Sequence, residues 1–275
     1  MRNTEVSDRL GRLRAAMAKR GIHAWVATTG DAHLSEYLGE RWQTRAWLSG
    51  FRGSAGRLVV TPDFAGLWVD PRYHQRADEE TRDAPIAVFK EGKPGTPDLL
   101  AWLAETLTKG TVVGFDPETL SIDAFAEYQA RLSPVGLDLR PVHGLIDEVW
   151  LDRPAETFSP IVVHPLEYAG EPAESKLARL RARVAEAGAN AVLLTALDEV
   201  AWLLNIRGND VPLNPVALAF CLVDMGSVRL YVRLDRVDDA LRAALPEEVE
   251  VCDYGVVAEG LAGLPAGTAL LLDPA

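Results

Sequence analysis

Apolar positions recur at helical spacing near the start of the chain and again in its second half. Two sets share this spacing, each on one face of a predicted helix: Leu10, Leu13 and Met17, and Leu177, Leu180 and Val184. A glycine follows each helix, Gly21 in the first half and Gly188 in the second, where a left-handed C-terminal cap is needed. An apolar run at residues 22–28, and another at 189–195, then predicts a strand in each half.

Both halves continue with the same phrase. Residues 47–53 read WLSGFRG and residues 202–208 read WLLNIRG. A strand, a tight turn and a second strand follow each phrase, which predicts a β-hairpin. The first hairpin ends at Asp70, a good N-cap, and Pro71, a good first helical residue, so we expect a helix over 72–81.

A third match concerns where each half ends. Residues 110–117 read GTVVGFDP and residues 267–274 read GTALLLDP. In the first half the chain continues through a helix capped by Ser121 and a strand at 136–142, whereas the second half stops almost at once. The second unit would then lack its closing helix and strand, and its strand at 269–273 would lie at an unfinished edge. We therefore expect this polypeptide to be a fragment of a longer protein.

The repeats predict an α/β fold built from two tandem, related domains. Strands alternate with helices and include hairpins, so each domain should be a mixed β-sheet with flanking helices. A proline-rich stretch, which begins near Pro154, reads as an extended connection between them. The expected domains are residues 1–153 and 154–275, the second of them truncated.

Composition narrows the class of protein. The 275 residues include 48% hydrophobic and 25% charged residues, typical of a soluble globular chain, and the formal net charge is −12. Such acidity argues against a nucleic-acid partner. The sequence contains neither a signal-peptide pattern nor an apolar run of membrane-spanning length, so we expect a cytoplasmic protein with no membrane partner. Cys221 and Cys252 have no metal-binding spacing and predict no disulfide framework.

No complete catalytic set is visible. Ser54 lies in RGSAG, which resembles half of a nucleophile elbow but has Arg52 in place of the first glycine and leads into a strand. Its glycines are more typical of a tight turn before the hairpin. We predict no nucleophile here.

Residues 31–36 are a second candidate. Asp31 follows the first strand, as Asp198 does in the second half, and each would N-cap a short helix. His33 and Glu36 are three residues apart and would share a face of that helix. Two ligands are too few for a metal site, so no metal is predicted.

Arg72 follows the first hairpin and precedes a predicted helix. An arginine there can point away from the domain, with its planar fork free to bind a carboxylate or a backbone carbonyl. The alternative is a salt bridge with the acidic residues of the next helix, Asp78, Glu79 and Glu80. Spacing alone favours the salt bridge.

Trp42 is unusual among the seven tryptophans because it lies in a polar insertion, GERWQTRA, that the second half lacks. An aromatic residue flanked by charges is a candidate contact surface for a partner. Local packing is an equal alternative.

Several phrases in order resemble one family. The segments TGDAHLSEYL, AWLSGFRGSAG, LWVDPRYHQRA and VWLDRPA, at 29–38, 46–56, 67–77 and 149–155, are similar to those of cytosolic Xaa-Pro aminopeptidases of the creatinase/prolidase superfamily. The resemblance runs from about residue 7 to the end. It implies two creatinase-N-terminal-like domains followed by a catalytic domain that is absent from this sequence.

The resemblance also implies an activity. The parent enzyme would remove the N-terminal residue from peptides whose second residue is proline, using two divalent metal ions, manganese being the usual one, held by the absent domain. This chain would hold no metal, have no peptidase activity alone, and help to form the substrate cleft and a homodimer. Arg72 would bind substrate, although Pro71 replaces a frequent glycine and alters its approach. Asp31, His33 and Glu36 would line the same cleft, and Trp42 would lie at an interface. The competing hypothesis is a stand-alone dimerisation or partner-binding module.

Overall fold

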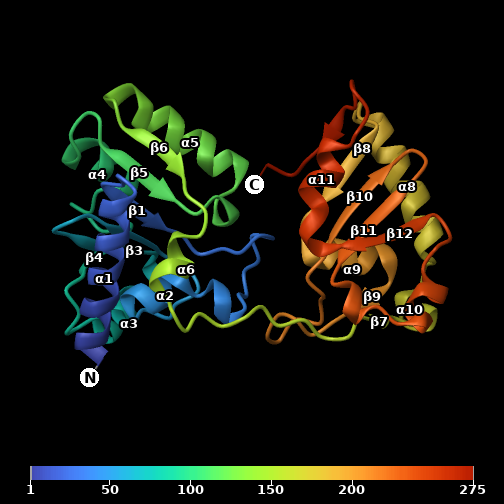
Figure 1. The fold of residues 1–275 in the computed structure, drawn as a ribbon, viewed down its shortest axis with the longest axis horizontal. Coiled ribbons are helices and arrows are strands. Elements are labelled where there is room, and N and C mark those ends of the chain that lie inside the picture. Colours follow the sequence, from blue (N-terminus) through green and yellow to red (C-terminus); the bar gives the residue numbers. More distant parts are fainter. Residues whose placement is uncertain (1, 275) are drawn as a thin grey trace. The chain divides into compact units, whose positions relative to one another are not determined.

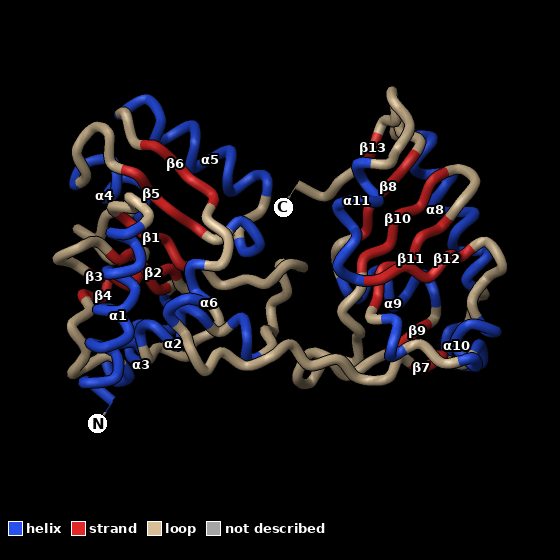
Figure 2. Tube along the Cα trace, viewed as in Figure 1, coloured by secondary structure: helices blue, strands red, loops and turns tan. Residues whose placement is uncertain are grey.

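The computed structural model describes residues 2–274 and divides the chain into two compact units, the first ending at Ala155 and the second spanning Glu156–Pro274 (Figure 1). Each unit contains its own sheet, its own flanking helices and its own apolar core (Figure 2). The predicted fold class, two tandem α/β domains with mixed sheets, is confirmed.

The first unit is built on a six-stranded sheet in the order β4-β3-β2-β1-β5-β6. The strands are β1 Ala24–Ala27, β2 Arg57–Val60, β3 Ala65–Val69, β4 Ala87–Lys90, β5 Val112–Phe115 and β6 Asp138–Pro141. Only β2 runs antiparallel to its neighbours, so the other five strands end at one edge of the sheet.

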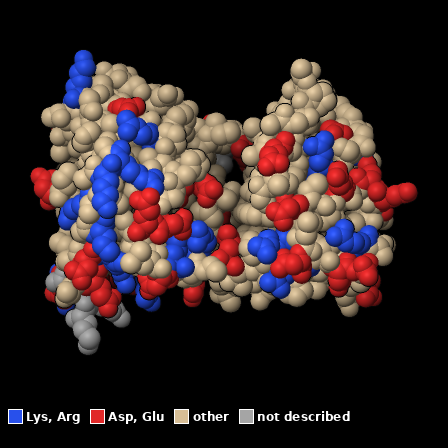
Figure 3. Space-filling model, viewed as in Figure 1, with Lys and Arg blue, Asp and Glu red and all other residues tan. Residues whose placement is uncertain are grey.

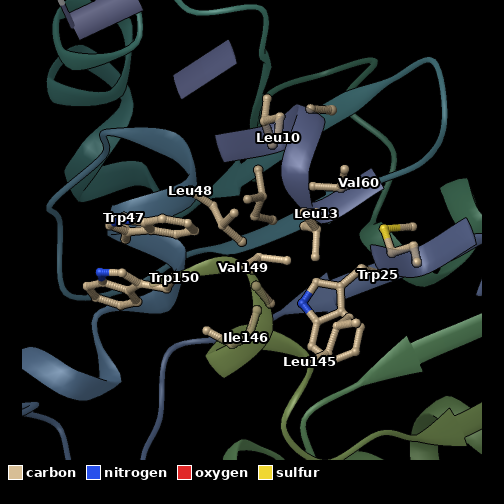
Figure 4. Close-up of a cluster of buried hydrophobic side chains, with 14 of the residues drawn as sticks. Leu10, Leu13, Trp25, Trp47, Leu48, Val60, Leu145, Ile146, Val149 and Trp150 are labelled. Atoms are coloured by element: carbon tan, nitrogen blue, oxygen red, sulfur yellow. The ribbon is translucent and has the colours of Figure 1, made fainter. Parts of the chain in front are cut away.

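Helices cover both faces of this sheet. The helices are α1 Arg2–Lys19, α2 Thr44–Ser49, α3 His74–Glu80, α4 Leu99–Thr106, α5 Ile122–Leu132 and α6 Leu145–Val149. Side chains of β1 alternate between two cores, since Trp25 packs with α1, α2 and α6 whereas Val26 packs with α4 and α5. Figure 4 shows the first core, where the Trp47 and Trp150 rings stack with centroids 4.9 Å apart.

The second unit repeats the plan with a five-stranded sheet in the order β12-β11-β10-β8-β13. Its strands are β8 Ala191–Leu194, β10 Phe220–Asp224, β11 Val228–Val232, β12 Val249–Asp253 and β13 Leu270–Leu271, and a separate pair is β7 Val162–Val163 with β9 Ile206–Arg207. Its helices are α7 Leu166–Ala169, α8 Ala173–Glu186, α9 Leu197–Leu204, α10 Asp239–Ala244 and α11 Val257–Ala262. Both units also contain short 3-10 helices: Glu40–Trp42, Pro71–Tyr73, Pro117–Thr119, Ser133–Val135, Leu234–Arg236 and Tyr254–Val256.

The repeated pattern explains the common plan. Gly21 and Gly188 both have positive φ, +63° and +75°, as predicted for left-handed caps. The two predicted hairpins form as β2–β3 and β10–β11. Strand β13 pairs with β8 just as β5 pairs with β1, and it lies at the sheet edge, with no counterpart of β6 beside it among residues 156–274.

The prediction that Asp198 caps a helix is wrong. Helix α9 begins one residue earlier, at Leu197, so Asp198 lies within its first turn and Ala196 occupies the N-cap position. An acidic side chain in the first turn still interacts favourably with the helix dipole.

Candidate functional site

A surface hollow of about 630 Å³ lies where the parallel strands of the first unit end. Strands β1, β3, β4 and β5 finish there and the antiparallel β2 begins there, so the loops of five strands meet at one edge, the usual place for a binding site in an α/β sheet. The hollow is lined by Thr28, Thr29, Leu34, Ser35, Glu36, Ser54, Ala55, Gly56, Arg57, Asp70, Arg72, Glu91, Thr119, Leu120, Ser121, Ala124, Glu127 and Tyr128.

Arg72 reaches this hollow from the turn after β3. The Asp70 carboxylate accepts the backbone N–H of Arg72 at 2.9 Å and so caps the 3-10 helix that starts at Pro71. The same carboxylate binds the guanidinium: Nε lies 3.2 Å from Oδ1 and 3.1 Å from Oδ2, and Nη2 lies 2.6 Å from Oδ2. The Arg72 side chain remains 69% exposed.

The salt bridge that spacing favoured, between Arg72 and the acidic residues of the next helix, is therefore wrong, because Arg72 pairs with Asp70 instead. Asp78 binds Lys90 and Glu80 binds Arg76, whereas Arg72 turns back over Asp70. The physical reason is the 3-10 turn at 71–73, which precedes α3 and keeps Arg72 away from the acidic face of that helix.

The contact between Asp70 and Arg72 shifts the pKa of both groups. The hydrogen bond from Arg72 holds the pKa of Asp70 below its usual range. The pKa of Arg72 is raised, first by its hydrogen bond to Asp70 and least by the charge of Glu36. Both groups are therefore ionised at neutral pH, and together they carry no net charge.

Tyr73 is a neighbour that sequence reasoning missed. Its hydroxyl lies 2.7 Å from Ser54 Oγ, and this hydrogen bond lowers the pKa of Tyr73. The Arg72 guanidinium lies over the Tyr73 ring, 5.5 Å from its centroid. Ser54 thus borders the hollow with a tyrosine as its partner, which tethers the glycine-rich turn to the start of α3.

Arg45 is the second residue that sequence reasoning missed. Its side chain is buried, and burial lowers its pKa to about 10. Its guanidinium donates to Thr29 Oγ1 at 2.9 Å, to Phe51 O at 3.2 Å and to Gly53 O. Arg45 thereby supports two walls of the hollow from behind.

The repeat contains a signal that identifies Arg45. Counting back from the shared tryptophans, Arg45 precedes Trp47 by two residues as Val200 precedes Trp202, and Val200 is a buried core residue of α9. A charged residue at a core position of the first copy, where the second copy has an apolar one, indicates that the first unit has polar groups there that need a donor.

The segment 31–36 forms a turn, so the helix expected after Asp31 is wrong. Asp31 is buried, and its Oδ1 accepts the backbone N–H groups of His33 and Ser35, each at 2.9 Å. This pattern winds the chain into a tight turn in which Leu34 has φ of +53°. His33 is buried too, whereas Glu36 is exposed and lines the hollow. The structure therefore brings Glu36, and neither Asp31 nor His33, to the surface that Arg72 borders.

Trp42 is buried, with 8% of its surface exposed. The guanidinium of Arg153 covers its ring, 5.6 Å from the centroid, and Arg153 also donates to Arg41 O at 3.0 Å. The local-packing alternative accounts for this tryptophan, because little of its side chain is left for a partner to contact.

Other chemistry is sparse in residues 2–274. No group of three or more His, Cys, Asp or Glu side chains there is arranged to hold a metal ion. Cys221 and Cys252 are free thiols, and burial raises the pKa of Cys221 to about 12. No helix in the same range is both long and apolar enough to cross a bilayer. Figure 3 shows a row of basic side chains along α1. The sequence of this helix includes Arg9, Arg12, Arg14 and Lys19.

Known proteins resemble this chain over nearly all of its length. Aminopeptidase P2 of Arabidopsis thaliana is 37% identical over 276 residues, covering 98% of this chain and 39% of that protein. The Xaa-Pro aminopeptidase ApepP of Drosophila melanogaster is 39% identical over 214 residues, covering 77% of this chain and 35% of that protein. The chain thus spans well under half the length of these relatives.

A solved structure also matches. The crystal structure of X-prolyl aminopeptidase from Caenorhabditis elegans, described as a cytosolic enzyme with a di-nuclear active site, aligns with a TM-score of 0.89 and 33% identity. The alignment covers 94% of this chain and 44% of that one. Residues 9–149 and residues 152–275 each match a model of the creatinase/prolidase N-terminal domain. The chain therefore belongs to the creatinase/prolidase N-terminal domain family, with one such domain in each of its two units.

Proposed function

We propose that this chain is the N-terminal, non-catalytic region of an Xaa-Pro aminopeptidase, which removes the N-terminal residue from peptides whose second residue is proline. In this proposal the hollow of the first unit forms one wall of the substrate cleft, and Arg72 donates hydrogen bonds to the bound peptide. The observation that carries it is the exposed, pre-oriented Arg72 at the carboxyl edge of the sheet, in a chain similar throughout to X-prolyl aminopeptidases.

The chemistry of the hollow suits a peptide. A peptide backbone offers carbonyl acceptors, and the hollow offers the Arg72 guanidinium as a donor, with Thr29 in the wall beside it. Thr29 is held in place, since its Oγ1 donates to Gly56 O at 2.9 Å and accepts from Arg45. Because its proton is used by Gly56 O, Thr29 shapes the wall, and Arg72, held by Asp70, is the donor that positions a substrate at low entropic cost.

The hydrolytic centre belongs elsewhere in this proposal. The relative from Caenorhabditis elegans is described with a di-nuclear active site, and residues 2–274 here do not fit one. We propose that two divalent metal ions, with manganese expected, are held by a further domain of a longer protein. A cytoplasmic location and a homodimer complete the proposal, and light scattering would test the second.

The proposal is tested on the longer protein that contains this chain. Arg72→Ala should lower kcat/KM for an Xaa-Pro peptide by about ten- to a hundredfold, the scale of a lost charged hydrogen bond to the substrate. Arg140→Ala is the matched control, because Arg140 is an exposed arginine of the same unit that is paired with Asp138 and does not line the hollow.

Two outcomes would contradict the proposal. Kinetics of Arg72→Ala equal to those of Arg140→Ala would remove Arg72 from the cleft. Turnover of the same peptide by the purified 275-residue chain would show that the hydrolytic centre lies within it.

A further inference from the structure

The pairing of Arg72 with Asp70 limits what Arg72 can bind. The bidentate contact uses Nε and one N–H of Nη2. Among residues 2–274, no other hydrogen bond or ion pair of the Arg72 side chain exists, so both N–H groups of Nη1 and the second of Nη2 remain available. Because Asp70 already occupies the Nε edge of the fork, a ligand can reach Arg72 only through the end formed by Nη1 and Nη2.

Charge around the hollow decides which ligands that end of the Arg72 fork favours. Its lining contains four carboxylates, Glu36, Asp70, Glu91 and Glu127, against the two guanidinium groups of Arg57 and Arg72. Arg57 is paired with Glu91 as Arg72 is with Asp70, so both cations are already neutralised. Glu127 is paired with Arg131 at 3.6 Å, so Glu36 is the lining carboxylate that has no ion pair among residues 2–274. A ligand carboxylate entering here would meet neutralised cations and the negative charge of Glu36, whereas a neutral carbonyl would not be repelled.

We propose that Asp70 is a positioning residue that makes Arg72 a donor to neutral peptide carbonyls and excludes free carboxylates. The inference rests on the proposed function and deepens it: where the peptide meets Arg72, the hollow takes a chain that continues or is amidated, and rejects a chain that ends in a carboxylate. The Arg72 side chain is held rigidly, since the Asp70 carboxylate both caps the turn at 71–73 and binds the Arg72 guanidinium.

Asp70→Asn separates these two tasks of the carboxylate. Asparagine is as good an N-cap as aspartate, so the turn at 71–73 should survive. The negative charge and the bidentate contact are lost, which frees the Arg72 fork for an incoming carboxylate. Asp138→Asn is the matched control, because Asp138 and Arg140 form an exposed pair with the same spacing on β6, away from the hollow.

The experiment measures kcat/KM of the longer protein for Xaa-Pro peptides of two, three and four residues, each as the free acid and as the amide. For the length whose terminus meets Arg72, the wild type should prefer the amide by about tenfold or more. Asp70→Asn should reduce that preference at least about fivefold through KM for the acid, and Asp138→Asn should leave it unchanged.

The outcomes separate this inference from the function on which it rests. If Arg72→Ala has no effect on any peptide, the proposed role of the hollow fails. If Arg72→Ala weakens turnover while Asp70→Asn leaves the amide-to-acid ratio as in the wild type at every length, only the role of Asp70 is overturned. A thermal melt of each variant checks that the turn has survived.

Discussion

Arg72 lines the hollow and Arg45 supports its walls from behind, and the two arginines have opposite environments. Arg72 is exposed and has a carboxylate partner, whereas Arg45 is buried and is held by three neutral oxygens. A buried guanidinium loses its hydration, and hydrogen bonds to protein oxygens offset that loss only when each bond is well aligned. Arg45 therefore serves the shape of the hollow, while Arg72 is available to a ligand.

Arg45→Met tests that distinction. The change should destabilise the chain by about 2 kcal/mol, because the carbonyl oxygens of Phe51 and Gly53 lose this donor inside the protein. Urea unfolding measures the loss. The free energy of unfolding of Arg45→Lys should lie between those of the wild type and of Arg45→Met, since one ammonium group cannot reach three acceptors as a planar fork does.

The control for this measurement is Arg140→Met at the exposed edge of the sheet, where we expect a change within about 0.5 kcal/mol. A loss for Arg45→Met no larger than that of the control would mean that the buried guanidinium does not support the loop at 51–56.

Single elements differ in how closely they approach the sheet. Helix α11 lies against β11 through Gly260, where an added Cβ would come 1.8 Å from Tyr231 Oη and 2.7 Å from its Cζ. The Tyr231 side chain is fully buried, so its ring cannot move aside cheaply. By contrast, a Cβ added at Gly11, in the middle of α1, would have no neighbouring atom within 4 Å.

We therefore expect alanine at these two glycine positions to change the free energy of unfolding in opposite directions. Gly11→Ala should raise the free energy of unfolding by about 0.5–1 kcal/mol, because alanine loses less backbone entropy in a helix. Gly260→Ala should lower it by about 1–3 kcal/mol despite the same gain in helix propensity, because the methyl group overpacks the contact with Tyr231. Denaturant unfolding of both variants measures the pair, and equal signs would refute the packing argument.

At the scale of the molecule, the two units are separate in their cores. The apolar clusters of the first sheet draw only on residues up to Trp150, and those of the second only on residues from Phe158 onward. Both units exceed the size at which a single core becomes sufficient for folding.

We accordingly expect residues 1–155 and residues 156–275 to fold when produced separately. The amide spectrum of each piece should show the wide dispersion of a folded domain. A piece that gives the narrow dispersion of an unfolded chain would show that its unit needs the other.

Much of the architecture follows from local patterns in the sequence. The tandem repeat, the two glycine caps and the hairpins are encoded in spacing and in residues with special backbone freedom, so they are visible before any tertiary contact is known. The capping role of Asp70 is equally local, since its acceptor and the N–H of Arg72 are two residues apart.

Only the tertiary structure decided which side chains meet. It buried Arg45 and Trp42, turned Arg72 onto Asp70, and brought Glu36 to the hollow while leaving Asp31 and His33 inside the turn. Spacing cannot foresee these outcomes, because burial and partner choice depend on strands and loops that are distant in the chain. The sequence by itself thus determined two related α/β units and their family, whereas folding determined which side chains line the hollow of the first unit.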